Sequence, residues 1–252
     1  MVSQLPHDEY ERNSSVQALK MGPRHSERQR STHAGPGLWM PIIIVICVGV
    51  AGLLIKSTNF ARTEINISIW LTQHQLPAVS AVAGAIATAF SSVVATIIAA
   101  ITTVIIGIVN TIRRASHFLW VVFVSWGGTA ILKPIVQRPR PNAELLHDPV
   151  SPQTGVLSYP SGHTAFATAL FLAIALTLIS HKHRRLALLL ASIGIVVVAA
   201  SRVYVGAHFM TDVTAGATAS AASCWFATTV WTNYIRPHIE HQRAQATATE
   251  RI

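Results

Sequence analysis

The stretch LWMPIIIVICVGVAGLLI, residues 38–55, is a run of eighteen residues without a charged side chain. A helix needs about 20 apolar residues to cross the hydrocarbon core of a bilayer, so this run predicts a transmembrane helix. The residues before it are polar and rich in Ser, His, Arg, Gln, Gly and Pro. Because they lack the apolar area that offsets the entropy of ordering, we expect residues 1–37 to form a disordered tail. A signal peptide would not follow so long a polar leader, so the span is expected to stay uncleaved.

Further apolar runs follow along the chain, at about Ala78–Val109, His117–Leu132, Thr164–Ser180, Leu186–Ala200 and Val213–Ile235. Together they predict an all-α polytopic membrane protein, a six-transmembrane-helix bundle over residues 38–235 with a C-terminal tail at 236–252. The second run exceeds one crossing, and its start is rich in small residues, so we expect part of it to lie at the membrane interface. Residues 56–76 mix apolar and polar side chains, which suits a segment on the bilayer surface or a plain connecting loop. In the last run, small residues predict close helix packing: Ala217, Ala219, Ser220 and Ala222.

The composition favours a membrane partner over nucleic acid. Hydrophobic residues make up 51% of the 252 and charged residues only 12%, about half the roughly 25% of a soluble domain. The net charge is +9, from 19 Lys+Arg against 10 Asp+Glu. Thirteen of these basic residues fall on one side of the predicted spans: Arg12, Lys20, Arg24, Arg28, Arg30, Arg113, Arg114, Lys182, Arg184, Arg185, Arg236, Arg243 and Arg251. This excess predicts that both termini are cytoplasmic, and it explains most of the net charge without a nucleic-acid partner.

The six remaining basic residues fall on the other side, namely Lys56, Arg62, Lys133, Arg138, Arg140 and Arg202. Four of them lie in two polar stretches at span ends, residues 133–141 (KPIVQRPRP) and 201–212 (SRVYVGAHFMTD). A third stretch, residues 159–164 (YPSGHT), opens the fourth predicted span. A helical bundle brings all three stretches to one face of the membrane. Charged groups near hydrocarbon are costly, so their clustering predicts a functional site there, facing the extracytoplasmic side.

These stretches carry the groups that bind a tetrahedral oxyanion. Lys133, Arg140 and Arg202 supply three cations, and guanidinium groups match the geometry of phosphate oxygens. Ser161 adds a hydroxyl donor. The turn through Ser161 and Gly162 opens a helix, whose backbone N–H groups and positive dipole end suit an anion.

The same stretches hold two histidines and a carboxylate. His208 and Asp212 are four residues apart, so in a helical turn the carboxylate can accept from one ring nitrogen and leave the other as a nucleophile. His163, from a different span end, can donate a proton to a leaving oxygen. The set is complete for phosphoryl transfer without a metal or other cofactor.

The three stretches resemble the Lys-x6-Arg-Pro, Pro-Ser-Gly-His and Ser-Arg-x5-His-x3-Asp motifs of the type 2 phosphatidic acid phosphatase (PAP2) superfamily, and the layout resembles its integral-membrane lipid phosphatases. This resemblance implies that His208 forms a phosphohistidine, with Asp212 as its partner and His163 as the acid. It implies a phosphate cradle of Lys133, Arg140, Ser161, Gly162 and Arg202. Arg138 stands outside the fixed motif positions, so we interpret it as a charge at the rim of the site or at the membrane interface.

The expected function is hydrolysis of the terminal phosphate of a membrane lipid phosphate or diphosphate. Phosphatidate, phosphatidylglycerophosphate and polyprenyl diphosphates all fit, and no residue in the motifs separates them. Two alternatives stay open: a lipid phosphotransferase that uses the same histidines, and a non-catalytic transporter or binder of lipid phosphates. The sequence leaves the oligomeric state open.

Overall fold

The computed structural model describes residues 36–58, 60–147 and 156–249. Within this described part every regular element is a helix, which confirms the predicted all-α class. The predicted disordered tail, 1–37, lies almost wholly outside the described residues. The elements are α2 (Pro36–Ser57), α3 (Phe60–Gln73), α4 (Pro77–Ala89), α5 (Ser92–Val109), α6 (Ile112–Ala130), α7 (Leu132–Val136), η1 (Ala143–Leu145), α8 (Gly162–Thr177), α9 (Arg184–Tyr204), α10 (Met210–Val230), η2 (Trp231–Ile235) and α11 (Arg236–Thr249).

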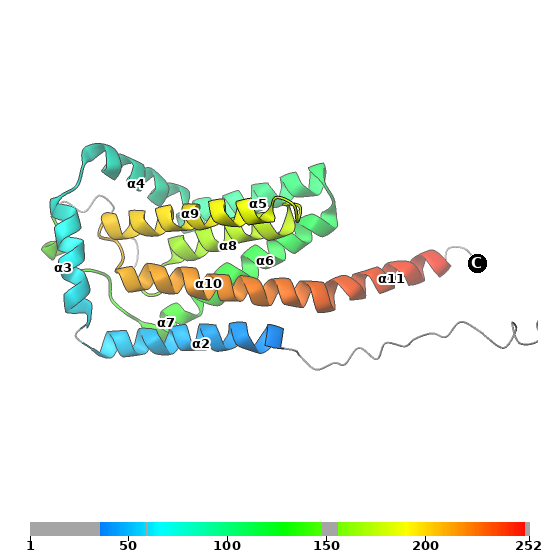
Figure 1. Ribbon diagram of the computed structural model, residues 1–252, viewed down its shortest axis with the longest axis horizontal. Coiled ribbons are helices and arrows are strands. Elements are labelled where there is room, and N and C mark those ends of the chain that lie inside the picture. Colours follow the sequence, from blue (N-terminus) through cyan, green and yellow to red (C-terminus); the bar gives the residue numbers. More distant parts are fainter. Residues whose placement is uncertain (1–35, 59, 148–155, 250–252) are drawn as a thin grey trace, which may run out of the picture. The chain divides into compact units, whose positions relative to one another are not determined.

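The long helices lie side by side, and one helix runs across their end (Figure 1). α10 packs against α2, α6 and α8, while α8 also packs against α9 and α6. α3 lies crosswise over the end of the bundle where α10 begins. At the other end, α10 continues through η2 into α11.

Four helices of the described part are candidate membrane spans by their length and composition. Gly37–Ser57, Ser92–Val109, Ile112–Val136 and Arg184–Tyr204 are long and apolar enough to cross a bilayer. The long second run is broken: α4 and α5 are separate helices, so only its second half is long enough. α8 is apolar but has 16 residues, and α10 is rich in Ala, Ser and Thr. The predicted count of six spans is therefore not confirmed.

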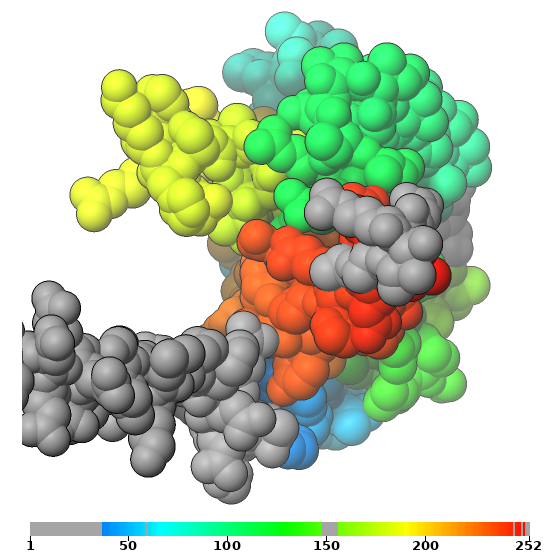
Figure 2. Space-filling model, turned by 90° about the vertical axis from the view of Figure 1, so that its right-hand side faces the viewer, coloured from blue at the N-terminus to red at the C-terminus, as the bar shows by residue number. Residues whose placement is uncertain are grey.

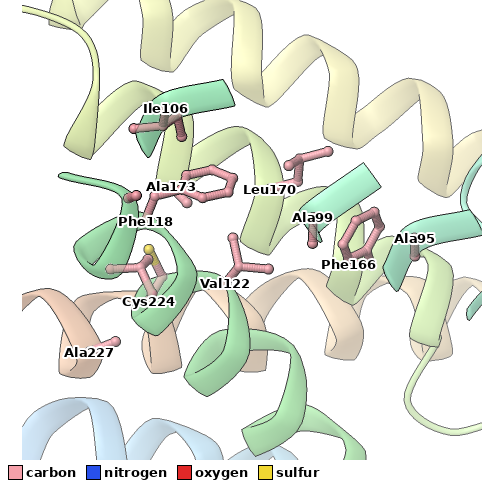
Figure 3. Packing of buried hydrophobic residues seen from close by; sticks show 12 residues of the cluster. Ala95, Ala99, Ile106, Phe118, Val122, Phe166, Leu170, Ala173, Cys224 and Ala227 are labelled. Carbon is pink, nitrogen blue, oxygen red and sulfur yellow. The ribbon is translucent and has the colours of Figure 1, made fainter. Parts of the chain in front are cut away.

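The core is built where α5, α6, α8 and α10 meet (Figure 3). Phe118 and Val122 of α6 and Phe166 of α8 all belong to this cluster, and all three side chains are buried. On α10, Ala219, Ser220 and Ala222 are buried, as the small-residue pattern predicted, whereas Ala217 is half-buried. In contrast, aliphatic side chains on the outer faces are exposed, as is expected of helices surrounded by lipid: Ile43, Ile46, Ile97, Ile105, Val109, Leu189, Leu190 and Val196.

The end of the bundle opposite α3 collects the turn between α5 and α6, the turn between α8 and α9, and α11 (Figure 2). These segments carry seven of the thirteen basic residues that the sequence assigns to one side of the membrane: Arg113, Arg114, Lys182, Arg184, Arg185, Arg236 and Arg243. The three motif stretches lie at the other end. These seven basic residues and the motif stretches thus lie at opposite ends of the bundle.

Candidate active site

The end covered by α3 brings the predicted site residues together from four helices and two loops. Their positions follow from the element bounds: Lys133 is in α7, Arg140 follows it, Ser161 caps α8, Gly162 and His163 begin α8, Arg202 is in the last turn of α9, His208 lies between α9 and α10, and Asp212 is in the first turn of α10. The candidate site is therefore assembled where the ends of these helices converge.

His208 and Asp212 form the centre of this arrangement. Nδ1 of His208 lies 3.5 Å from Oδ2 of Asp212, and both side chains are almost fully buried. His208 precedes α10, so the pair is brought together by the turn before the helix, where a helical i,i+4 spacing was expected. Burial lowers the pKa of His208 from 6.5 to about 4, although Asp212 acts in the opposite direction. The imidazole is therefore neutral at pH 7, with Nε2 directed away from the carboxylate's side of the ring.

Asp212 is held in place by several donors. Its carboxylate accepts hydrogen bonds from the Ser158 hydroxyl, from the backbone N–H of Phe209 at 2.9 Å and from Arg138 Nη1 at 2.8 Å. The Phe209 bond closes the first turn of α10. A carboxylate with this many donors is ionised and fixed in orientation, which suits it to align His208.

The N-terminus of α8 is locked against α10. The backbone N–H of Ser161 donates to the carbonyl of Asp212 at 2.9 Å, and the Ser161 hydroxyl accepts from the Thr164 N–H. The Ser161 N–H is therefore engaged by protein, which corrects the expectation that it faces an anion. Gly162 and His163 are the first residues of the helix, so their N–H groups have no intrahelical carbonyl as a partner.

The three predicted cations are each anchored to a backbone carbonyl. Lys133 Nζ donates to Leu157 O at 3.3 Å, Arg140 Nη1 to Ala207 O at 3.0 Å, and Arg202 Nη2 to Ala83 O at 2.9 Å. Such bonds fix the direction of long side chains that would otherwise lose entropy on binding a ligand.

The cations are close enough to affect one another and the histidines. Arg140 exerts a charge effect on Lys133 and on Arg202, and Arg140 and Lys133 both act on His208. His163 experiences the charges of Arg202, His208 and Arg140. Positive charges held together in a buried region repel each other unless an anion joins them, so the arrangement is suited to a phosphate.

Arg138 is not at the rim of the site, which corrects the sequence-based interpretation. Arg138 is only 2% exposed. Its guanidinium bridges Asp212 and Glu64 of α3, with Nη2 2.6 Å from Glu64 Oε2. It also lies over the Phe209 ring, 4.1 Å from the centroid. The motif position of Arg138 could not indicate its burial, because its partner Glu64 is 74 residues away in the chain.

Glu64 was missed by the sequence reasoning, together with Ser158 and Thr211. One signal was present: Glu64 is the only acidic residue between Glu27 and Glu144. A single carboxylate in a segment expected at the membrane surface is costly unless it has partners, so its isolation in the sequence indicates a buried partner. Ser158 and Thr211 gave no comparable signal, because hydroxyl side chains are common in this chain.

Comparisons with known proteins match part of the chain, including the segment that carries the three motif stretches. Residues 114–236 match the sequence model of the PAP2 superfamily. Phosphatidylglycerophosphatase B of Bacillus subtilis (strain 168) is 37% identical over 92 residues, which are 34% of this chain and 42% of that protein. The chain thus matches less than half the length of this curated relative.

A solved structure shares the fold. The first transmembrane PAP2 type phosphatidylglycerolphosphate phosphatase from Bacillus subtilis superposes with a TM-score of 0.67 at 22% identity, covering 78% of this chain and 98% of that one. With its four apolar helices, this likeness identifies an integral membrane protein. The segment that matches the PAP2 superfamily, residues 114–236, contains all three motif stretches.

Proposed function

We propose that this protein is a membrane phosphatase that removes the terminal phosphate from a lipid phosphate or diphosphate, with His208 as the nucleophile. One observation carries the proposal: a buried, neutral imidazole lies beside a fixed carboxylate and within the field of Lys133 and Arg140. A neutral imidazole is the nucleophilic form, and the cations neutralise the phosphate oxygens that would otherwise repel it.

In the proposed reaction, Lys133, Arg140, Arg202, Ser161 and the N–H groups of Gly162 and His163 hold the terminal phosphate. Nε2 of His208 attacks phosphorus as the bond to the leaving oxygen breaks. The leaving oxygen keeps the electron pair of that bond and takes a proton from His163. A bound phosphate dianion favours the protonated form of His163. Asp212 stabilises the positive charge on the phosphorylated imidazole. Water then attacks phosphorus and passes a proton to His163. The bond between phosphorus and Nε2 of His208 breaks, its electron pair returns to the imidazole, and inorganic phosphate is released.

Two apolar grooves beside the site support a lipid substrate. One, of about 650 Å³, is lined by α3, α4, α9 and α10, and the other, of about 470 Å³, by α2, α10 and Tyr159. Both include Met210 and Thr214, in the first turns of α10 next to Asp212. Acyl or prenyl chains in these grooves would stay in lipid while the phosphate reaches the cations.

We further propose that α2, α5, α6, α8, α9 and α10 all cross the membrane. The basic segments at the far end then place both termini in the cytoplasm and the site on the extracytoplasmic side. The name of the Bacillus relative makes phosphatidylglycerophosphate the first substrate to test, followed by phosphatidate and a polyprenyl diphosphate.

The test is phosphate release from these three lipids by the purified full chain in detergent. We expect His208→Ala to abolish release, whereas His181→Ala, in the exposed turn between α8 and α9, should match the wild type. Because the proposed site uses cations of the chain, EDTA should leave the rate unchanged and vanadate should inhibit. Full activity of His208→Ala would refute the mechanism, loss of all turnover in EDTA would refute metal independence, and a phosphorylated acceptor in place of free phosphate would identify a transferase.

A further inference from the structure

The buried residues of α3 form a polar stripe of Glu64, Ser68 and Thr72, spaced four apart. The outward face is mixed, because Arg62, Asn66, Ile67 and Trp70 are all exposed. A polar stripe turned toward the protein is the reverse of a helix in a soluble protein, and it suits a helix that covers a polar site.

Glu64 connects α3 to the residues around His208. Its Oε1 accepts from the backbone N–H of Thr211 at 2.8 Å, and its Oε2 accepts from the Thr211 hydroxyl at 2.9 Å and from Arg138 at 2.6 Å. The Thr211 N–H belongs to the first turn of α10, where the helix dipole also favours a negative charge. Glu64 is 4% exposed, so this network is shielded from water.

The network has a definite charge. Arg138 bridges Glu64 and Asp212, so the cluster holds two carboxylates and one guanidinium and carries a net charge of −1. Removing the carboxylate of Glu64 would leave a neutral Arg138–Asp212 pair. Removing the guanidinium would instead leave two buried carboxylates, both bonded to the same short segment of chain.

We infer that Glu64 and Arg138 are positioning residues that keep one net negative charge next to His208, matching the one positive charge that the imidazole gains when it is phosphorylated. This inference rests on the proposed role of His208 as nucleophile. In a buried region little water is present to screen charges. A cluster with one negative charge too few or too many for the phosphorylated imidazole is therefore costly. α3 is then part of the catalytic machinery as well as a cover over it.

The other charged and titratable groups around His208 come from several elements, and all of them remain in the variants proposed here. They are Lys133 of α7, Arg140 of the following loop, His163 of α8, Arg202 of α9 and Asp212 of α10. Their contributions therefore cancel in a comparison among variants that change only Glu64 and Arg138.

The charge count can be read directly from the titration of His208. In protein with ¹⁵N-labelled histidine, the His208 ring signals are assigned by their loss in His208→Ala, and their midpoint is followed with pH. Glu64→Gln should lower the midpoint by about one pH unit and Arg138→Gln should raise it by a similar amount. The double variant restores the charge of −1, so its midpoint should return to the wild-type value.

Phosphate release provides the second readout. We expect Glu64→Gln to reduce kcat by about 10- to 100-fold, less than the 10²–10³-fold cost of a group that touches the developing charge, with little change in KM. Glu64→Asp should recover part of the rate. Glu240→Gln removes the same charge from the exposed helix α11 and should alter neither readout.

Equal midpoints in the wild type and both single variants would overturn the inference, even if activity fell, because a merely structural role would lower the rate without moving the titration. If one single variant fails to accumulate, the other single variant and the double variant still separate the two roles. A charge role moves the His208 midpoint in the single variant and restores it in the double variant, whereas a structural role moves neither. If the wild type releases no phosphate from any lipid, the proposed function fails, while the midpoints still report on the cluster.

Discussion

Gly216 of α10 lies directly against the backbone of Ser161, a residue of the proposed phosphate cradle, so a single methyl group there tests how closely the site is packed. A Cβ at this position would lie 2.6 Å from the carbonyl oxygen of Ser161, 3.3 Å from its nitrogen and 3.4 Å from its carbonyl carbon. These are backbone atoms at the start of α8, so no side-chain rotation can make room. Gly216→Ala therefore requires Ser161 and α10 to move apart.

The size of the effect follows from these distances. Ordinary contact begins at 3.4 Å, so the oxygen and the new methyl group must separate by about 0.8 Å. A misplacement near 1 Å costs on the order of 10²-fold in rate, and Ser161 is also bonded through its N–H to Asp212 O. Overpacking costs about 1–3 kcal/mol, of which about 1 kcal/mol is returned by the helix preference of Ala over Gly. We expect a large loss of kcat with a net destabilisation of roughly 0–2 kcal/mol.

The assay is lipid phosphate release together with thermal unfolding in the same detergent, with kcat measured well below the unfolding temperature. Gly127→Ala is the matched control, because Gly127 also lies within a helix and a Cβ there meets nothing within 4 Å. The control should retain full activity and gain up to about 1 kcal/mol from the same helix preference. Wild-type kcat and stability in Gly216→Ala would refute the claim that α8 and α10 are in fixed contact at the cradle.

Two further predictions concern single residues. Because burial lowers the pKa of His208 to about 4, its ring should stay neutral as the pH falls from 7 to 5, and the ¹⁵N titration of the wild type should have its midpoint near 4. A midpoint near 6.5 would mean that water reaches the ring and that the nucleophile is half protonated in mild acid. Gln137 ends α7 in the left-handed region at φ 51°, where a non-glycine residue costs about 1–2 kcal/mol and glycine loses about 0.5–1 kcal/mol to chain entropy. Gln137→Gly should therefore raise the unfolding temperature by a few degrees, and a lower temperature would contradict the assigned conformation.

Much of the site could be predicted from the sequence because its residues lie at the ends of apolar runs. A run such as 38–55 fixes where a helix must stop, and polar motifs placed at those stops converge when the helices pack. His163, Arg202 and Asp212 were predictable in this way. The span count was less predictable: α8 has only 16 residues, and α10 replaces large apolar side chains with Ala, Ser and Thr that let its neighbours approach. A hydropathy pattern detects helices that face lipid. Because α10 packs largely against other helices, its side chains are less apolar and the pattern is weaker.

The partners of Asp212 could not be predicted, because they depend on which helix covers the end of the bundle. Residues 56–76 gave a mixed pattern, and only the fold turns Glu64 inward. Arg138 looked like a solvated charge because nothing adjacent in sequence pairs with it. Yet three buried charges can coexist only if each has a partner, so Arg138 and Glu64 must be considered together with Asp212. In the proposed mechanism, Lys133, Arg140 and Arg202 bind the phosphate, whereas the cluster of Glu64, Arg138 and Asp212 holds one negative charge beside His208. The proposed phosphoryl transfer then places a positive charge on the imidazole of His208. The net charge of Glu64, Arg138 and Asp212 is therefore as much a part of the proposed site as the motif residues.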